Sequence, residues 1–246
     1  MPRSAYAPRH RGVVGTAADR GFLASAAAAV ESFFLEPVAP PPAADSAEPP
    51  DQRPVVCVFG LARGCGVTSV ARALAAELAV RDRAGTAAVC CDDRPGGIPL
   101  ATRAATRLAH LLEDVPSAEP RPMGRLCLVG GADPLPLSDT ARHHAPLVID
   151  AGSAALGGAP ASVADRTVIV TTPAIEPALA QVGAECVARA GPTPIVVLNR
   201  APQDQRGTLA LPSSPMGARL ALGGREARGA LGGAIADLAD LIEELE

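Results

Sequence analysis

The stretch Val55–Ser69, VVCVFGLARGCGVTS, decides the fold that we expect. It opens with five consecutive apolar residues, Val55–Phe59, as is typical of a central parallel strand buried on both faces. Three glycines follow within seven positions. Residues Thr68–Val80 then read as a helix, because apolar side chains recur every four positions on one face. The stretch therefore predicts a strand, a glycine-rich turn and a helix in immediate succession.

A turn of this kind is suited to binding an anion. Glycines let the backbone point its N–H groups inward, and the helix that follows adds the partial positive charge of its N-terminus. Thr68 and Ser69 place hydroxyls in the first helical turn, one suited to Mg²⁺ and the other to a phosphate oxygen. The alternative is a tight turn whose hydroxyls only cap the helix.

The alternation of strands and helices continues to the end of the chain. It predicts an α/β domain with a mostly parallel sheet and helices on both faces, whose ligands bind at the carboxyl ends of the strands. The expected strands are Val55–Phe59, Thr86–Cys91, Arg125–Val129, Pro146–Ile149, Thr167–Val170 and Pro194–Leu198. The further expected helices are Ile98–Leu112, Glu176–Ala190 and Gly229–Leu245. Residues Leu209–Leu222 are expected to be irregular, with a short edge strand.

Residues 1–54 differ in composition from the domain expected over residues 55–246. Residues 1–16 are polar and without periodicity, which is typical of disorder. Residues 17–35 are expected to form one short helix that holds three of the four phenylalanines. Residues 37–54 contain seven prolines in eighteen positions and are expected to be an extended linker. The helix either docks on a protein partner or folds back on its own domain.

The composition argues against several functions. The formal net charge is −4, so no strong positive field attracts nucleic acid. All 22 basic residues counted as Lys or Arg are arginines, which excludes any mechanism that needs a lysine from this chain. No stretch of about 18 apolar residues predicts a membrane span. The six cysteines lack Cys-x-x-Cys spacing and a neighbouring histidine, so they predict a reduced, cytoplasmic protein without a cysteine metal site.

The glycine turn resembles the phosphate loop of the ParA/MinD family, SIMIBI-class P-loop ATPases in which Gly-Lys-Gly-Gly-x-Gly-Lys-Thr-Thr follows the first strand. Aligned on the last glycine, the positions that fit this pattern are Gly64, Cys65, Gly66, Thr68 and Ser69.

The same alignment shows where the loop departs from the family pattern. Val67 occupies the position of the loop-closing lysine, so the Walker A loop is degenerate and lysine-free. The early lysine of the family falls on Ala62, next to Arg63, and its first loop glycine falls on Leu61.

Three downstream strand ends extend the resemblance as far as Arg200. It implies that Asp92 helps to orient the attacking water and that Asp150 lies, with Thr68, near Mg²⁺. The spacing between Asp150 and Gly152, whose family counterpart senses the γ-phosphate, is shortened in this chain. Asn199 ends the strand whose asparagine contacts adenine in the family. The nucleotide-binding residues implied in this way are Arg63, Gly64, Cys65, Gly66, Val67, Thr68, Ser69 and Asn199.

The missing lysine shapes the function that we expect. Its charge-assisted contact is worth roughly 1.5–3 kcal/mol, and its loss slows catalysis further because the contact acts where charge develops. The resemblance therefore implies a pseudo-ATPase that binds ATP or ADP with Mg²⁺ and hydrolyses it weakly or not at all. Such a protein would act as a homodimeric scaffold or spatial regulator, like the TadZ/CpaE branch that positions pilus or secretion machinery, and a partner would recruit it to the membrane or pole.

Two alternatives of another kind stay open. An active ATPase could use Arg63 in place of the lysine. An enzyme of the related dethiobiotin-synthetase or amidotransferase type needs the loop lysine, so the lysine-free sequence counts against it.

Overall fold

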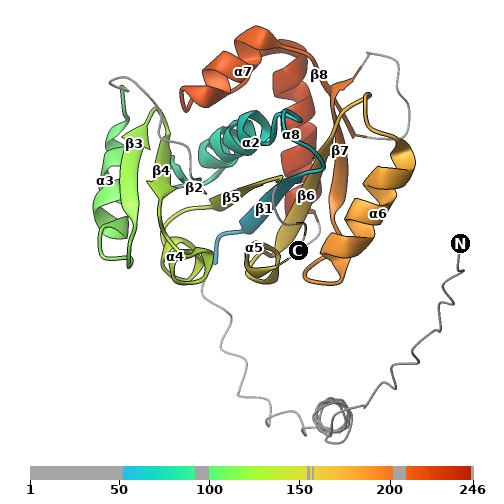
Figure 1. The fold of residues 1–246 in the computed structure, drawn as a ribbon. Coiled ribbons are helices and arrows are strands. Elements are labelled where there is room, and N and C mark those ends of the chain that lie inside the picture. Colours follow the sequence, from blue (N-terminus) through green and yellow to red (C-terminus); the bar gives the residue numbers. More distant parts are fainter. Residues whose placement is uncertain (1–51, 92–99, 154–155, 157, 202–208, 245–246) are drawn as a thin grey trace, which may run out of the picture. The chain divides into compact units, whose positions relative to one another are not determined.

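An eight-stranded sheet forms the centre of the structure, a computed structural model, in the order β3-β4-β2-β5-β1-β6-β7-β8 (Figure 1). Every neighbouring pair is parallel except β3 and β4. The prediction of a mostly parallel α/β sheet is confirmed. The strands are β1 (Val55–Gly60), β2 (Ala87–Cys90), β3 (Glu119–Met123), β4 (Leu126–Gly130), β5 (Leu147–Gly152), β6 (Arg166–Thr171), β7 (Ile195–Ala201) and β8 (Leu209–Pro212).

The structure describes residues 52–91, 100–153, 156, 158–201 and 209–244, which belong to the compact unit Pro50–Glu246. The predictions for residues 1–51 and for Asp92 lie outside these ranges. Within them, no helix has the length and apolar character that a membrane crossing requires.

Helices cover both faces of the sheet (Figure 1). One face packs against α2, α7 and α8, and the other against α3, α4, α5 and α6. All of β1 is buried, with Val56 and Val58 in the first core and Cys57 and Phe59 in the second. The helices are α2 (Val67–Arg81), α3 (Arg103–Leu112), α4 (Pro134–Ala141), α5 (Ala159–Ser162), α6 (Pro177–Ala188), α7 (Pro215–Leu222) and α8 (Gly229–Glu243).

The sheet topology directs attention to the carboxyl end of β1. This strand lies between β5 and β6, which follow one another in the chain but pair with opposite sides of β1. In open α/β sheets, ligands bind at the carboxyl ends of strands where the connections diverge in this way. The glycine turn that follows β1 occupies that position.

Several elements depart from their prediction. In the stretch 209–222 the expected short edge strand is present as β8, but the residues after it are not irregular, because they form α7, whose first turn is capped by the Ser214 hydroxyl accepting the Gly217 N–H at 3.0 Å. Strand β3 contains Pro120 and Pro122, which argue against a strand, but it lies at the edge of the sheet, where a missing N–H is tolerated. The short helices α4 and α5 were also not predicted.

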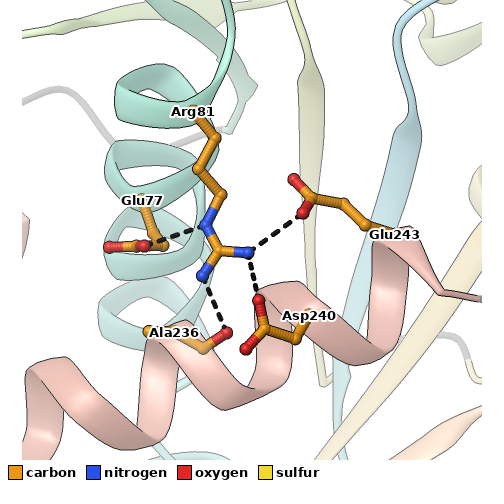
Figure 2. A network of polar contacts seen from close by, with 5 residues as sticks. All are labelled: Glu77, Arg81, Ala236, Asp240 and Glu243. Carbon is orange, nitrogen blue, oxygen red and sulfur yellow. Dashed lines mark hydrogen bonds and ion pairs between the residues drawn. The ribbon is translucent and has the colours of Figure 1, made fainter.

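The far end of α2 is tied to α8 by Arg81 (Figure 2). Its guanidinium donates to the carboxylates of Glu77 at 3.0 Å, Asp240 at 2.6 Å and Glu243 at 3.0 Å, and to the carbonyl of Ala236 at 3.0 Å. Because α2 begins at the glycine turn, this network fixes the helix whose N-terminus faces the candidate site.

Candidate functional site

The turn between β1 and α2 is held open by two glycines in the left-handed region. Gly64 has φ +81° and Gly66 has φ +88°, a conformation that other residues adopt only with strain. Gly66 is also the N-cap of α2, and no side chain caps the helix. The N–H groups of residues 66–69 therefore have no acceptor within the helix. This is the backbone arrangement that the glycine spacing predicts for an anion site.

The side chain of Asn199, at the end of β7, is bonded to this turn. Its Nδ2 donates to the carbonyl of Cys65 at 2.7 Å, and its Oδ1 accepts the backbone N–H of Arg200 at 3.0 Å. Asn199 is buried, and a Cβ on Gly66 would lie 2.4 Å from its Nδ2. The close approach of Asn199 therefore requires a glycine at position 66, independently of the backbone conformation.

Val67 fills the base of the turn with an apolar side chain. It is buried as the first residue of α2, and its Cγ2 lies 2.3 Å from where a Cβ on Gly60 would be. The valine therefore packs directly against the last residue of β1. No cationic group stands at the position where the resemblance implies a lysine.

The polar groups of the turn differ in exposure. Arg63 and Gly64 lie at its exposed tip, and Arg63 makes no ion pair or hydrogen bond with another described residue. Thr68 and Ser69 are half-buried at the second and third positions of α2. Their hydroxyls thus stand beside the uncapped N–H groups of the helix.

Asp150 lies on β5, the strand next to β1, in register with Val58. Its Oδ1 accepts the N–H of Gly152 at 3.2 Å, and Gly152 has φ +60°. The carbonyl of Gly152 lies 3.6 Å from where a Cβ on Gly60 would be. Asp150 and Gly152 therefore lie close to the start of the glycine turn. Asp92 lies outside the described residues.

A cavity of about 210 Å³ adjoins the turn. It is smaller than the clefts of roughly 300–1,000 Å³ that usually hold drug-sized ligands. Its polar lining was only partly predicted, since Arg200, Ser213 and Ser214 were not among the candidate residues. Arg200 has φ +59°, which is unusual for a residue with a side chain, and this could not be read from the sequence. The polar lining consists of Gly66, Ser69, Asn199, Arg200, Ser213 and Ser214.

The thiols near the sheet centre are unsuited to nucleophilic chemistry. Burial raises the pKa of Cys57, with smaller contributions from Cys90 and Asp150. Burial likewise raises the pKa of Cys127 to about 12.

The described residues contain no cluster of three or more His, Cys, Asp or Glu side chains able to hold a metal ion.

No protein-family model matches the chain, and no curated protein matches it in sequence. Among solved structures, it is similar to a ParA family ATPase from Chlorobium tepidum, with a TM-score of 0.51 and 17% sequence identity. The match covers 76% of this chain and 98% of the ATPase. This similarity shows a ParA-like P-loop fold.

Proposed function

We propose that the chain is a degenerate ParA/MinD-like P-loop protein that binds nucleotide weakly, hydrolyses it weakly or not at all, and acts as a scaffold or spatial regulator. The observation that carries the proposal is the burial of Val67 against Gly60. The turn keeps the backbone shape of a phosphate loop, but its cation is replaced by an apolar contact.

The residues present fit the phosphates of ATP or ADP. The uncapped N–H groups at the start of α2 would donate to phosphate oxygens, together with the hydroxyl of Ser69. Thr68 and Asp150 would hold Mg²⁺, which keeps most of its ligands from water and phosphate when proteins bind it. Asn199 retains one amide hydrogen and one lone pair beyond its bonds to Cys65 and Arg200, and these remain available to a base.

Val67 in place of a lysine determines how strongly we expect nucleotide to bind and how fast we expect it to be hydrolysed. A charge-assisted hydrogen bond contributes roughly 1.5–3 kcal/mol, so its absence weakens nucleotide binding by about one to two orders of magnitude. Turnover is expected to fall further, because the lysine of a P-loop enzyme stabilises charge that develops on the transferred phosphoryl group. Binding without efficient hydrolysis suits a protein that signals by its bound state.

The scaffold role rests on the resemblance to the TadZ/CpaE branch and on the segment before the domain. We propose a homodimer that meets a protein partner through the phenylalanine-containing segment 17–35 and is recruited by it to the membrane or pole. Pilus or secretion machinery is the process that this resemblance favours. The part of the expected linker that precedes Gln52 would give the segment its reach, since Gln52 and Arg53 bond to Arg142 and Asp82 of the domain.

One observation favours a second candidate, an ATPase that uses Arg63 as its cation. Arg63 is exposed on the glycine turn and is not engaged by another described residue. A guanidinium in that position can bind a phosphate in two-pronged geometry. Loss of both nucleotide binding and turnover in Arg63→Ala would establish this candidate.

The deciding experiment measures binding of a fluorescent ATP analogue with Mg²⁺ and release of phosphate. For the scaffold we expect weak binding and negligible turnover by the wild type. Val67→Lys should tighten binding by about tenfold or more if only the charge was lost. Val67→Met is the matched control, since it lengthens the side chain without adding charge. Efficient wild-type turnover, or equal tightening by both variants, would contradict the proposal.

A further inference from the structure

We propose that Arg142 and Arg166 form a binding site for a small oxyanion, a carboxylate or phosphate group, at the amino ends of β1 and β6. Both arginines line a cavity of about 210 Å³. The glycine turn follows the carboxyl end of β1, so the two sites lie at opposite ends of the parallel strands. The cavity is lined by Gln52, Pro54, Arg142, Asp165, Arg166 and Ile242.

The protein uses only part of the hydrogen-bonding capacity of these guanidiniums. Nη1 of Arg142 donates to Oε1 of Gln52 at 3.1 Å and lies 3.6 Å from Oδ1 of Asp165. Nη1 of Arg166 donates to the backbone carbonyl of Asp165 at 2.8 Å. Each guanidinium has five N–H donors in a fixed plane, so both retain donors for a further acceptor.

Two of these donors are buried without a partner. Nε of Arg142 and Nε of Arg166 are both shielded from solvent, and neither has a hydrogen-bond partner among the described residues. Buried N–H groups of folded proteins are almost always paired. Both groups belong to guanidiniums that line one cavity, so the protein itself pairs these two arginines incompletely.

The charge around the cavity is unbalanced in the direction that an anion would correct. Two guanidiniums face one carboxylate, Asp165, whose Oδ2 already accepts the N–H of Val55 at 2.7 Å. Arg166 forms no ion pair with a carboxylate of another described residue.

Three further acids, Asp82, Asp240 and Glu243, are paired with other arginines. Asp82 pairs with Arg53 at 3.1 Å. On α8, which supplies Ile242 to the cavity, Asp240 and Glu243 bind Arg81 (Figure 2).

The chemistry of the donors defines the ligand. A planar guanidinium matches the spacing of two oxygens in a carboxylate or phosphate and binds them through parallel hydrogen bonds. The cavity is small and its lining includes the apolar side chains of Pro54 and Ile242, so it suits a single oxyanion group rather than an extended polyanion. The ligand is an oxyanion taken from solution, and inorganic phosphate is its simplest probe.

The test measures phosphate binding to the full chain by calorimetry at constant ionic strength, with chloride as the balancing salt. Because the glycine turn is also expected to bind phosphate, the sites are separated by variants. Gly66→Ala disables the turn, and on that background Arg166→Gln should weaken the remaining binding by about tenfold or more. Arg166→Lys keeps the positive charge but not the planar guanidinium, and it should also weaken the phosphate binding. Arg107→Gln, which alters an exposed arginine of α3, should have no effect.

Arg142→Gln provides a second variant should Arg166→Gln impair folding, which circular dichroism would reveal. Phosphate binding that is the same in Arg166→Gln and Arg107→Gln would overturn the proposal. Absence of phosphate binding in the Gly66→Ala background would also overturn it. Binding of the ATP analogue is measured in parallel, and it should be unchanged by Arg166→Gln, so failure of this site and failure of the proposed function remain distinguishable.

Discussion

The amide of Asn199 holds the carbonyl of Cys65 at 2.7 Å across a sequence separation of 134 residues. The bond joins the end of β7 to the glycine turn after β1, so the shape of the turn depends on a strand two places away in the sheet. The same amide lines the neighbouring cavity. One side chain therefore joins the glycine turn to the wall of that cavity.

Asn199→Ala should loosen the glycine turn. It leaves the Cys65 carbonyl without its partner, and we expect a loss of about 1–3 kcal/mol in the free energy of unfolding. Asn199→Asp should cost more than alanine, because a carboxylate oxygen would then face the carbonyl. Urea denaturation measures both losses. A smaller loss for aspartate than for alanine would contradict the orientation of the amide.

Gly66→Ala and Gly64→Ala form a matched pair that separates the cost of backbone strain from the cost of steric overlap with Asn199. Both glycines have positive φ, so each alanine should cost about 1–2 kcal/mol in backbone strain. Only at Gly66 would the new Cβ also collide with Nδ2 of Asn199, whereas nothing lies within 4 Å of the Cβ at Gly64.

Gly66→Ala should therefore be clearly the more destabilising of the two in urea denaturation. It should regain part of the difference when combined with Asn199→Ala. Equal losses for the two single variants would show that the overlap is relieved without cost.

The glycine turn was predictable because its signals are local. Glycine spacing, the apolar run before it and the helical period after it all lie within Val55–Val80, and β1 and α2 begin and end within one or two residues of the prediction. The short elements α4, α5 and α7 were missed because they span eight residues or fewer and give a periodic pattern little length in which to appear.

The interactions that complete the site were not predictable. The sequence shows that Val67 replaces a lysine, but only the structure shows its side chain packed against Gly60. Asn199 was expected to contact a base, yet its bond to Cys65 depends on the order of strands that bring β7 toward the turn. Arg166 carries no motif, and its unpaired Nε emerges only from the packing around the start of β6.

The buried thiol of Cys57 should make the protein sensitive to alkali. Burial raises its pKa above the 9.0 of an exposed thiol, so the unfolded chain loses this proton at lower pH than the folded one. The resulting stability is fully present below about pH 9 and declines as the pH rises further, by up to about 1.4 kcal/mol per pH unit for each such thiol.

The effect should be visible in this chain because it has no lysine and a single tyrosine to titrate in the same range. Melting temperatures measured from pH 7 to 11 should fall less steeply above pH 9 in Cys57→Ala than in the wild type. Cys186→Ala, which removes a half-buried thiol of α6, is the control and should keep the wild-type decline. Parallel pH profiles for all three proteins would contradict the assignment to Cys57.

Arg81→Met should weaken the connection between α2 and α8 while keeping the apolar stem of the side chain. The guanidinium binds three carboxylates and one carbonyl (Figure 2), but Asp240 and Glu243 are about half exposed. Solvent screens such pairs, so we expect the free energy of unfolding to fall by about 1–2 kcal/mol rather than by the sum of four strong bonds.

The loss should shrink at high salt, because exposed ion pairs are screened. Urea denaturation at low and high sodium chloride measures both effects, with Arg107→Met as the control for removing an exposed arginine. A loss that does not depend on salt would mean that the packing of the stem, and not the charge network, joins the two helices.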